Sequence, residues 1–326
     1  MMNAADLSIL ILGGGTIGRG WAVAFGAAGA GVHILDPDPA CADHLAGDWA
    51  RALPVLTGMG AVGEHPTLPC HILGLDELSA SPDFVQEALP ERLELKRGMF
   101  AALETRIAAD TPIASSTSGL ACADMQAGMV HPERLVIGHP CNPPWLMPVV
   151  ELLGSPATSS EAMDRAEATY QCLGKTVIRV RGERPGHLVN RLQAALWREV
   201  VHLALDGAAS LAEIDRAITE GLGPRWAAIG PSAIFHLAGG AGGMGKFLDD
   251  LGGEVDRWWL SLGTPRLDAT CRAALLADIA GDPVSWNIDA LVARRDGLVP
   301  AVLALTKRHR EENPAGEYQQ YGGKPQ

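Results

Sequence analysis

The chain has 326 residues, enough for two domains that each enclose a hydrophobic core. Its 26 Lys and Arg residues face 38 Asp and Glu residues, and the net charge of −12 argues against a broad surface for nucleic acid or an anionic membrane. No apolar run approaches the roughly 18 residues of a membrane-spanning helix, and no signal peptide is expected. Six cysteines without a CxxC pair indicate reduced thiols in a cytoplasmic protein.

In the first half of the chain, short apolar runs alternate with stretches able to form helices. These runs are uninterrupted, as the strands of a parallel sheet covered on both faces require. The expected strands are residues 8–12, 32–35, 70–73, 84–85, 113–116, 135–138 and, after a helix over 159–173, 176–180.

The second half is helical in character. Residues 188–205 contain no Gly or Pro and predict a long, largely buried helix, and Ser210 with Glu213 resembles a capping box that opens another. Further helices are expected over 267–280 and 291–309. The sequence therefore predicts an N-terminal α/β Rossmann domain over residues 1–182, a C-terminal all-α domain over 183–312, and a disordered tail over 313–326.

A glycine-rich turn follows the first expected strand. The GxGxxG pattern is formed by Gly13, Gly15, Thr16, Ile17 and Gly18. Its first glycine permits a tight turn, the second lets the backbone approach a pyrophosphate, and the third lets the helix pack on the strand. Asp36 ends the next expected strand, where a carboxylate can bind the ribose hydroxyls of NAD and would repel the 2′-phosphate of NADP.

The bare glycine pattern is not specific, because residues 240–245 also fit it. That second cluster lacks a preceding strand and is interpreted as a break between helices. For the first cluster, a turn that binds FAD or no nucleotide is the alternative to NAD.

Several longer stretches carry a resemblance to a known family. They are residues 86–96 (QEALPERLELK), 114–120 (ASSTSGL), 138–144 (GHPCNPP), 150–152 (VEL) and 190–192 (NRL). By them the chain resembles the 3-hydroxyacyl-CoA dehydrogenase superfamily over about residues 7–310, and within it the branch that acts on free acids, λ-crystallin/L-gulonate 3-dehydrogenase and L-carnitine dehydrogenase. The resemblance implies an NAD-dependent enzyme that oxidises the 3-hydroxyl of a small L-3-hydroxy carboxylic acid.

The same resemblance places four residues on catalytic positions. They are Ser118, His139, Glu151 and Asn190. Alcohol oxidation releases a proton, so it needs a base with a near-neutral pKa, and His139 is of the right type. Glu151 can fix the tautomer of that imidazole and stabilise its charged form. Ser118 and Asn190 can bond to the reacting oxygen or to the base.

From the residues alone, these four have simpler interpretations. His139 before a proline fits a structural turn, Ser118 fits a turn, and Asn190 fits the polar flank of a helix. Glu151 differs, because a carboxylate in an apolar strand needs a partner, and His139 is a plausible one. No second His or Cys has the spacing of a metal ligand, so no metal is expected.

Glu91 and Lys96 match family positions near the nicotinamide half of the cofactor. Their alternative is a solvated first turn of a helix. In the second half, Arg225 can clamp a substrate carboxylate, or it forms a salt bridge at a helix end. Trp145 and Trp226 flank the presumed site, where Trp faces attract quaternary ammonium groups such as that of carnitine, although core packing is the alternative for each.

The sequence therefore predicts oxidation of a free acid, with L-gulonate, L-carnitine and L-3-hydroxybutyrate as models, by a homodimer. No basic cluster suited to a phosphorylated CoA handle is evident, so a short-chain L-3-hydroxyacyl-CoA is the alternative substrate. A structural, crystallin-like protein that keeps only the nucleotide fold is a further alternative, disfavoured because all four catalytic-type residues are present.

Overall fold

The structure is a computed structural model that describes residues 2–313. It consists of two compact units, Met1–Leu192 and Gln193–Gln326. The boundary expected at residue 183 falls between the last strand and the first long helix, and it stays a prediction. The tail expected over 313–326 lies, apart from Asn313, outside the described residues. Within residues 2–313, no helix has both the length and the apolar character needed to cross a membrane.

In the described part of the first unit, eight strands form one sheet in the order β3-β2-β1-β4-β5-β6-β7-β8. They are β1 (Ser8–Leu12), β2 (Gly31–Leu35), β3 (Cys70–Ile72), β4 (Phe84–Glu87), β5 (Ile113–Ser115), β6 (Leu135–Pro140), β7 (Val149–Leu153) and β8 (Thr176–Arg179). The six strands from β3 to β6 in this order are parallel. The strand order reverses between β1 and β4, which is where doubly wound sheets open a crevice for a ligand at their carboxyl ends.

One connection departs from the expected parallel sheet. β7 runs antiparallel to β6, with His139 directly opposite Glu151, and β8 is parallel to β7. Residues 141–148, which join β6 to β7, are too few for the helical crossover that a parallel pair needs. The short loop therefore turns the chain back and brings the two polar residues together.

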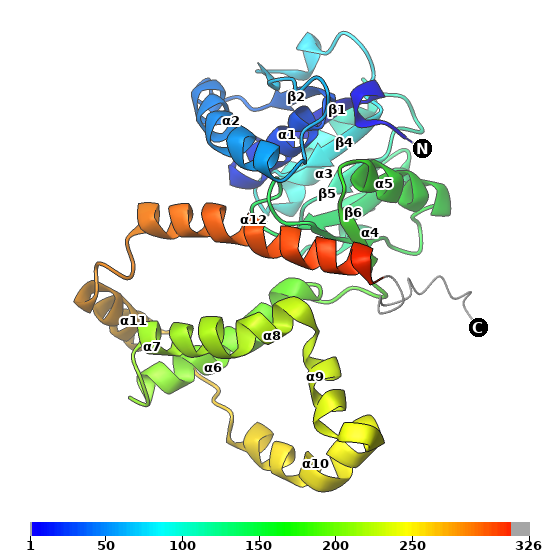
Figure 1. Ribbon diagram of the computed structural model, residues 1–326. Coiled ribbons are helices and arrows are strands. Elements are labelled where there is room, and N and C mark those ends of the chain that lie inside the picture. Colours follow the sequence, from blue (N-terminus) through cyan, green and yellow to red (C-terminus); the bar gives the residue numbers. More distant parts are fainter. Residues whose placement is uncertain (1, 314–326) are drawn as a thin grey trace. The chain divides into compact units, whose positions relative to one another are not determined.

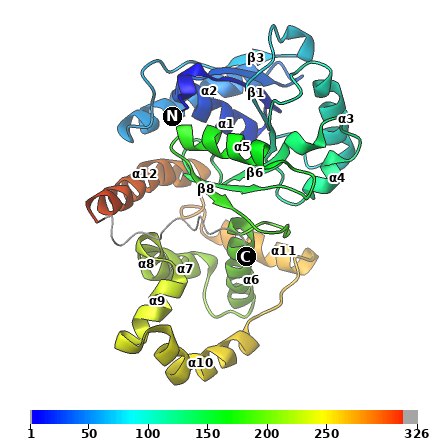
Figure 2. The same ribbon diagram turned by 90° about the vertical axis from the view of Figure 1, so that its right-hand side faces the viewer.

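Helices cover both faces of this sheet. They are α1 (Thr16–Ala27), α2 (Cys41–Gly58), α3 (Leu93–Glu104), α4 (Cys122–Gln126) and α5 (Ser160–Cys172), with 3-10 turns at Ala4–Asp6, Leu75–Glu77 and Pro132–Arg134. α1 lies beside α2 (Figure 1). Phe84 of β4 contacts Phe25 of α1 and Tyr170 of α5. The next residue, Val85, belongs to the opposite face, where it packs in one cluster with Phe100 of α3, beside α4 (Figure 2).

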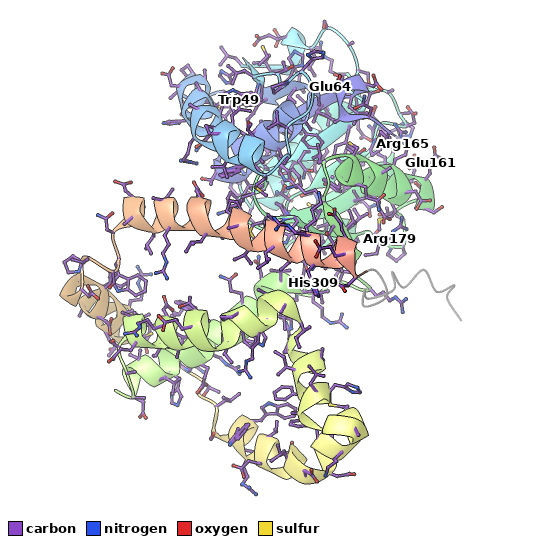
Figure 3. All side chains as sticks on the ribbon, in the orientation of Figure 1. Trp49, Glu64, Glu161, Arg165, Arg179 and His309 are labelled. Carbon is purple, nitrogen blue, oxygen red and sulfur yellow. The ribbon has the colours of Figure 1, made fainter. Side chains whose placement is uncertain are left out.

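Charge ties α5 to the edge strand β8. Arg179, at the end of β8, lies 2.5 Å from carboxylate oxygens of Asp164 and Glu167 on α5 (Figure 3). Arg165, on the same helix, binds Asp110 at 3.2 Å. These partly exposed pairs each contribute little to stability, about 0–1 kcal/mol, but they fix the edge of the sheet next to β7.

The second unit is helical. Its elements are α6 (Val189–Leu205), which begins in the first unit, α7 (Leu211–Arg216), a π-helical turn (Ala217–Leu222), α8 (Gly223–Ala228), α9 (Pro231–Ala238), a 3-10 turn (Gly240–Gly242), α10 (Gly243–Ser261), α11 (Ala269–Gly281) and α12 (Ile288–Glu312). The capping box is confirmed, since Ser210 Oγ accepts from the Glu213 N–H at 3.3 Å and Glu213 Oε2 accepts from the Ser210 N–H at 2.9 Å. The second glycine cluster joins α9 to α10, as expected (Figure 2).

The second unit has a small core in the single chain. A buried cluster forms around Val200, Leu211 and Ile214. The expectation of a largely buried helix over 188–205 is wrong for the single chain, because α6 leaves Trp197 46% exposed and Leu192 71% exposed. Several apolar side chains of α6 are therefore exposed, because the other described residues do not cover them.

Candidate active site

The glycine turn lies at the carboxyl end of β1 and leads into α1. Gly13 has a φ of +97°, a left-handed conformation that favours glycine. A Cβ on Gly18 would come within 1.8 Å of the Gly13 carbonyl oxygen, so Gly18 lets α1 pack closely. A Cβ on Gly15 would meet nothing within 4 Å, so the backbone is open there to an approaching group. Thr16 and Ile17 open α1, whose N-terminus has no side-chain cap and leaves its N–H groups for an anion.

Asp36 follows β2 and reaches this turn. Its Oδ2 accepts from the Gly14 N–H at 2.6 Å, and its Oδ1 accepts from the Asp38 N–H at 2.9 Å. Arg19, which the sequence reasoning missed, donates to the Gly14 carbonyl at 2.7 Å and pairs with Asp48 at 2.7 Å. Its guanidinium is thus committed to the loop and to a carboxylate. An open glycine, an uncapped helix N-terminus and a carboxylate at the end of β2 fit a dinucleotide with free ribose hydroxyls.

His139 and Glu151 form a buried pair across β6 and β7. His139 Nδ1 lies 3.0 Å from Glu151 Oε2, and the two side chains are 7% and 0% exposed. Because the carboxylate accepts, Nδ1 carries the proton and Nε2 keeps its lone pair in the neutral ring. Burial lowers the pKa of His139, and the bond to Glu151 opposes that shift. The imidazole is therefore neutral and basic at Nε2 near pH 7.

Glu151 and Asn190 connect this pair to the start of α6. Glu151 Oε1 accepts from the N–H groups of Leu188 at 2.7 Å and Val189 at 3.0 Å. Asn190, in the first turn of α6, places its Nδ2 at 3.3 Å from His139 Nε2. The structure thus brings together three of the four residues that the sequence singled out.

Ser118, the fourth residue, is exposed and joins the group through the backbone. Its carbonyl accepts from the Gly186 N–H at 3.0 Å, at the turn before α6. Its own N–H donates to Glu91 Oε1 at 3.1 Å. That carboxylate oxygen also accepts from the Gly119 N–H at 3.0 Å and from the Thr117 hydroxyl. Glu91 therefore shapes the turn that carries Ser118.

The alternative interpretation of Lys96 was a solvated residue in the first turn of a helix, and the structure contradicts it because the side chain is buried. Its side chain is 1% exposed, and Nζ lies 2.7 Å from Glu87 Oε1 and 3.4 Å from Glu91 Oε2. Glu87 also accepts from the Leu89 N–H at 2.6 Å and from the Ser115 hydroxyl. Burial raises the pKa of Glu87, and Lys96 opposes that shift. The sequence reasoning passed over Glu87, whose only signal is a carboxylate at the end of an apolar strand.

Lys175, also missed, holds the loop that follows His139. Its Nζ donates to the Met147 carbonyl at 2.9 Å and to the Pro144 carbonyl, and it lies 6.0 Å from the centroid of the Trp21 ring. Burial lowers its pKa to about 8. Trp145 lies in the same loop and is only 4% exposed, so it packs in the interior of the first unit.

Arg225 lies in the second unit, beside an apolar pocket of about 390 Å³. The pocket is lined by Pro224, Arg225, Ala228, Ile229, Ile234 and Leu237. Within the described residues Arg225 forms no ion pair, and its two expected roles, a carboxylate clamp or a salt bridge at a helix end, both stay predictions. Trp226, the next residue of α8, is 37% exposed and is not a core residue.

Two models of one family match the chain in succession. The NAD binding domain of 3-hydroxyacyl-CoA dehydrogenase matches residues 8–183, and the C-terminal domain of 3-hydroxyacyl-CoA dehydrogenase matches residues 186–260. The L-carnitine dehydrogenase of Streptomyces griseus is 44% identical over 301 residues, which cover 92% of this chain and 90% of that protein. The L-carnitine dehydrogenase of Pseudomonas aeruginosa is 38% identical over 297 residues, 91% of this chain and 92% of that protein.

Solved structures agree with this fold. A 5-formyl-3-hydroxy-2-methylpyridine 4-carboxylic acid 5-dehydrogenase, an NAD⁺ dependent dismutase, has a TM-score of 0.78 at 24% identity and covers 94% of this chain and 99% of its own. The (S)-3-hydroxybutyryl-CoA dehydrogenase of Ralstonia eutropha has a TM-score of 0.58 at 28% identity, over 74% of this chain and 84% of its own.

A Rossmann domain with an open glycine turn, followed by a helical domain, defines this protein as an NAD-dependent oxidoreductase. The chain belongs to the 3-hydroxyacyl-CoA dehydrogenase family, and its cofactor is NAD.

Proposed function

We propose that this protein oxidises the 3-hydroxyl of a small, free L-3-hydroxy carboxylic acid with NAD, and that His139 is the base. The buried His139–Glu151 pair carries this proposal, because it fixes an imidazole with a proton on Nδ1 and a lone pair on Nε2, which faces the amide of Asn190. A near-neutral base of this form is what alcohol oxidation needs.

The described residues suit each part of the reaction. His139 Nε2 takes the hydroxyl proton, and Glu151 stabilises the imidazolium that forms. Asn190 Nδ2, next to Nε2, is placed to donate to the reacting oxygen, and Ser118 is the second candidate donor. The turn around Gly13, with Asp36, would hold the cofactor, and Glu91, which pairs with Lys96, shapes the turn that carries Ser118. A contact of Glu91 and Lys96 with the nicotinamide half stays a prediction. NAD, when bound, would accept a hydride from C3 of the substrate, and the product would be a 3-keto acid.

L-Carnitine is the substrate that we place first among the free acids. The relatives at 38–44% identity are L-carnitine dehydrogenases. Arg225 has no ion-pair partner in the described part and borders an apolar pocket, so it is available to clamp a carboxylate through two parallel hydrogen bonds. Trp226, the next residue of α8, is 37% exposed and offers an aromatic face for a quaternary ammonium. A role of Trp145 in substrate binding stays a prediction.

Absorbance at 340 nm tests this proposal with four substrates: L-carnitine, L-gulonate, L-3-hydroxybutyrate and 3-hydroxybutyryl-CoA. We expect NADH formation with a free acid, and with L-carnitine first. Turnover of the thioester alone would overturn the choice of free acid. NAD binding without turnover of any substrate would favour the structural, crystallin-like role.

We also propose that the protein is a cytoplasmic homodimer. Along α10 and at the residue that follows it, apolar residues recur at spacings of three and four. They are Leu248, Leu251, Val255, Trp258 and Leu262, and all but Val255 are more than 40% exposed in the single chain. A second copy of the chain would bury this stripe and complete the small core of the helical unit. Light scattering should give twice the mass of the chain, and Leu251→Asp should give the monomer.

A further inference from the structure

His187 occupies the turn between β8 and α6 in an uncommon conformation. It is the only non-glycine residue with a positive φ, +48°, within the described residues, and its side chain is 2% exposed. A bulky side chain persists in this left-handed region only where its surroundings require it, and such residues cluster at functional sites. The sequence reasoning did not single out this histidine.

The contacts of His187 define its tautomer. Its Nε2 lies 3.0 Å from the carbonyl oxygen of Thr117, and a carbonyl only accepts, so Nε2 carries the proton. In the neutral ring, Nδ1 is then an acceptor. This Nδ1 is buried and has no hydrogen-bond partner within the described residues. A proton on Nδ1 would therefore create a buried donor without an acceptor.

The ring of His187 also packs against that of His139. Their centroids are 4.9 Å apart and the rings are tilted by 55°. The charged groups that face this pair are Glu151 from β7 and Glu91 from the loop after β4. Glu151 bonds to His139 and Glu91 bonds to the turn of Ser118, so neither carboxylate is bonded to His187. The ring of His187 therefore contacts the catalytic pair through packing and not through a bond to a carboxylate.

The backbone on either side of His187 adds two more connections. Gly186 donates to the Ser118 carbonyl at 3.0 Å, and Leu188 donates to Glu151 at 2.7 Å. Through its ring and its neighbours, this single turn thus contacts the loop of Ser118, the ring of His139 and the carboxylate of Glu151.

We propose that His187 is a positioning residue of this active site, and that its ring ties the Ser118 loop to the ring of His139. It acts on the reaction through those two residues and takes no proton from the substrate. This inference rests on the proposed function for its catalytic consequence, but the state of the ring can be measured without turnover.

Nitrogen-15 NMR of the histidine rings tests the proposal in the whole protein, with His139→Gln and His187→Gln to assign the two rings. In the wild type, the neutral ring of His187 should carry its proton on Nε2, and the neutral ring of His139 should carry its proton on Nδ1. A neutral His187 with its proton on Nδ1 overturns the proposal. The NMR measurement does not depend on turnover. If no hydroxy acid is a substrate, the proposed function is wrong, but the tautomer of His187 can still be measured.

Two variants then measure the effect on catalysis. His187→Phe keeps the ring packing but removes both nitrogens, and with them the bond from Nε2 to the Thr117 carbonyl. We expect kcat on the plateau to fall about tenfold because the Ser118 loop is released, and His187→Gln, whose amide can donate to Thr117, to recover most of it. An unchanged kcat in His187→Phe, or a His187→Gln variant no more active than His187→Phe, contradicts the role.

Discussion

The two units of this protein bury different kinds of side chain. In the first unit, buried positions include Gln86, Glu87, Lys96, His139 and Glu151, all held in hydrogen bonds or ion pairs. In the second unit, every fully buried side chain in the described part is apolar, and many Leu and Trp residues are exposed. Buried polar groups are costly unless paired, so they are kept where the chemistry needs fixed charges. The two units thus differ in kind: the first holds paired polar side chains in its interior, and the second leaves many apolar side chains at its surface.

The largest effect expected is from the loss of the base. His139→Gln should lower kcat/KM by about 10²–10⁴-fold, because general-base catalysis of this kind contributes that much. Binding of NAD, measured by tryptophan fluorescence, should be retained, since the glycine turn is separate. His44→Gln, on the exposed face of α2, is the matched control and should keep full activity. A His139→Gln enzyme with unchanged kcat/KM would show that His139 is not the base.

Breaking the buried ion pair should cost stability. Lys96→Met leaves Glu87 as a buried carboxylate without its cation, and the free energy of unfolding should fall by about 3–5 kcal/mol. Urea unfolding measures this value. The double variant Lys96→Met with Glu87→Gln should recover part of the loss, because it removes the unpaired charge. If the single variant is as stable as the wild type, the buried pair does not stabilise the first unit.

Arg225→Met tests recognition in the second unit. We expect the KM for an acid substrate to rise about 10–100-fold with kcat changed much less, because a charge-assisted pair that binds substrate and transition state alike is lost. The free energy of unfolding should stay the same, since Arg225 has no ion-pair partner in the described part. Arg216→Met, which removes only the exposed pair with Glu220, is the control. An unchanged KM would remove Arg225 from substrate binding.

The sequence was sufficient to predict most strands, the glycine turn and the helices near 159–173, 188–205, 267–280 and 291–309, because these depend on local patterns. The bounds of α2, α3, α4, α8, α9 and α10 were not predicted. The pairing of His139 with Glu151 was also predictable, since a carboxylate in an apolar strand needs a partner. His187 and Lys175 were not. Each sits beside a glycine in a turn, where a polar residue is ordinarily solvated. Only tertiary packing buries the ring of His187 and brings the ammonium of Lys175 onto the carbonyls of Pro144 and Met147. The exposure of α6 was missed for the converse reason, because an apolar pattern does not say which partner covers it.

The smallest effect concerns Lys175 and the pH dependence of stability. Its folded pKa of about 8 lies below the ordinary value of 10.5, so between these values the unfolded chain binds the extra proton and stability rises with pH. From pH 7 to pH 9 the rise should be about 1 kcal/mol. Buried thiols act in the opposite direction, because burial raises the pKa of Cys122 and of Cys172 to about 11.

Comparison with Lys175→Met separates these contributions, since both proteins contain the same thiols. Urea unfolding at pH 7 and pH 9 should show that the variant lacks the rise that the wild type gains from Lys175. Equal pH slopes in the two proteins would mean that this ammonium is not desolvated. The charge of Lys175 would then make no contribution to the pH dependence of stability. The stability of the first unit would depend less on buried charged groups than the hydrogen bonds and ion pairs in its interior indicate.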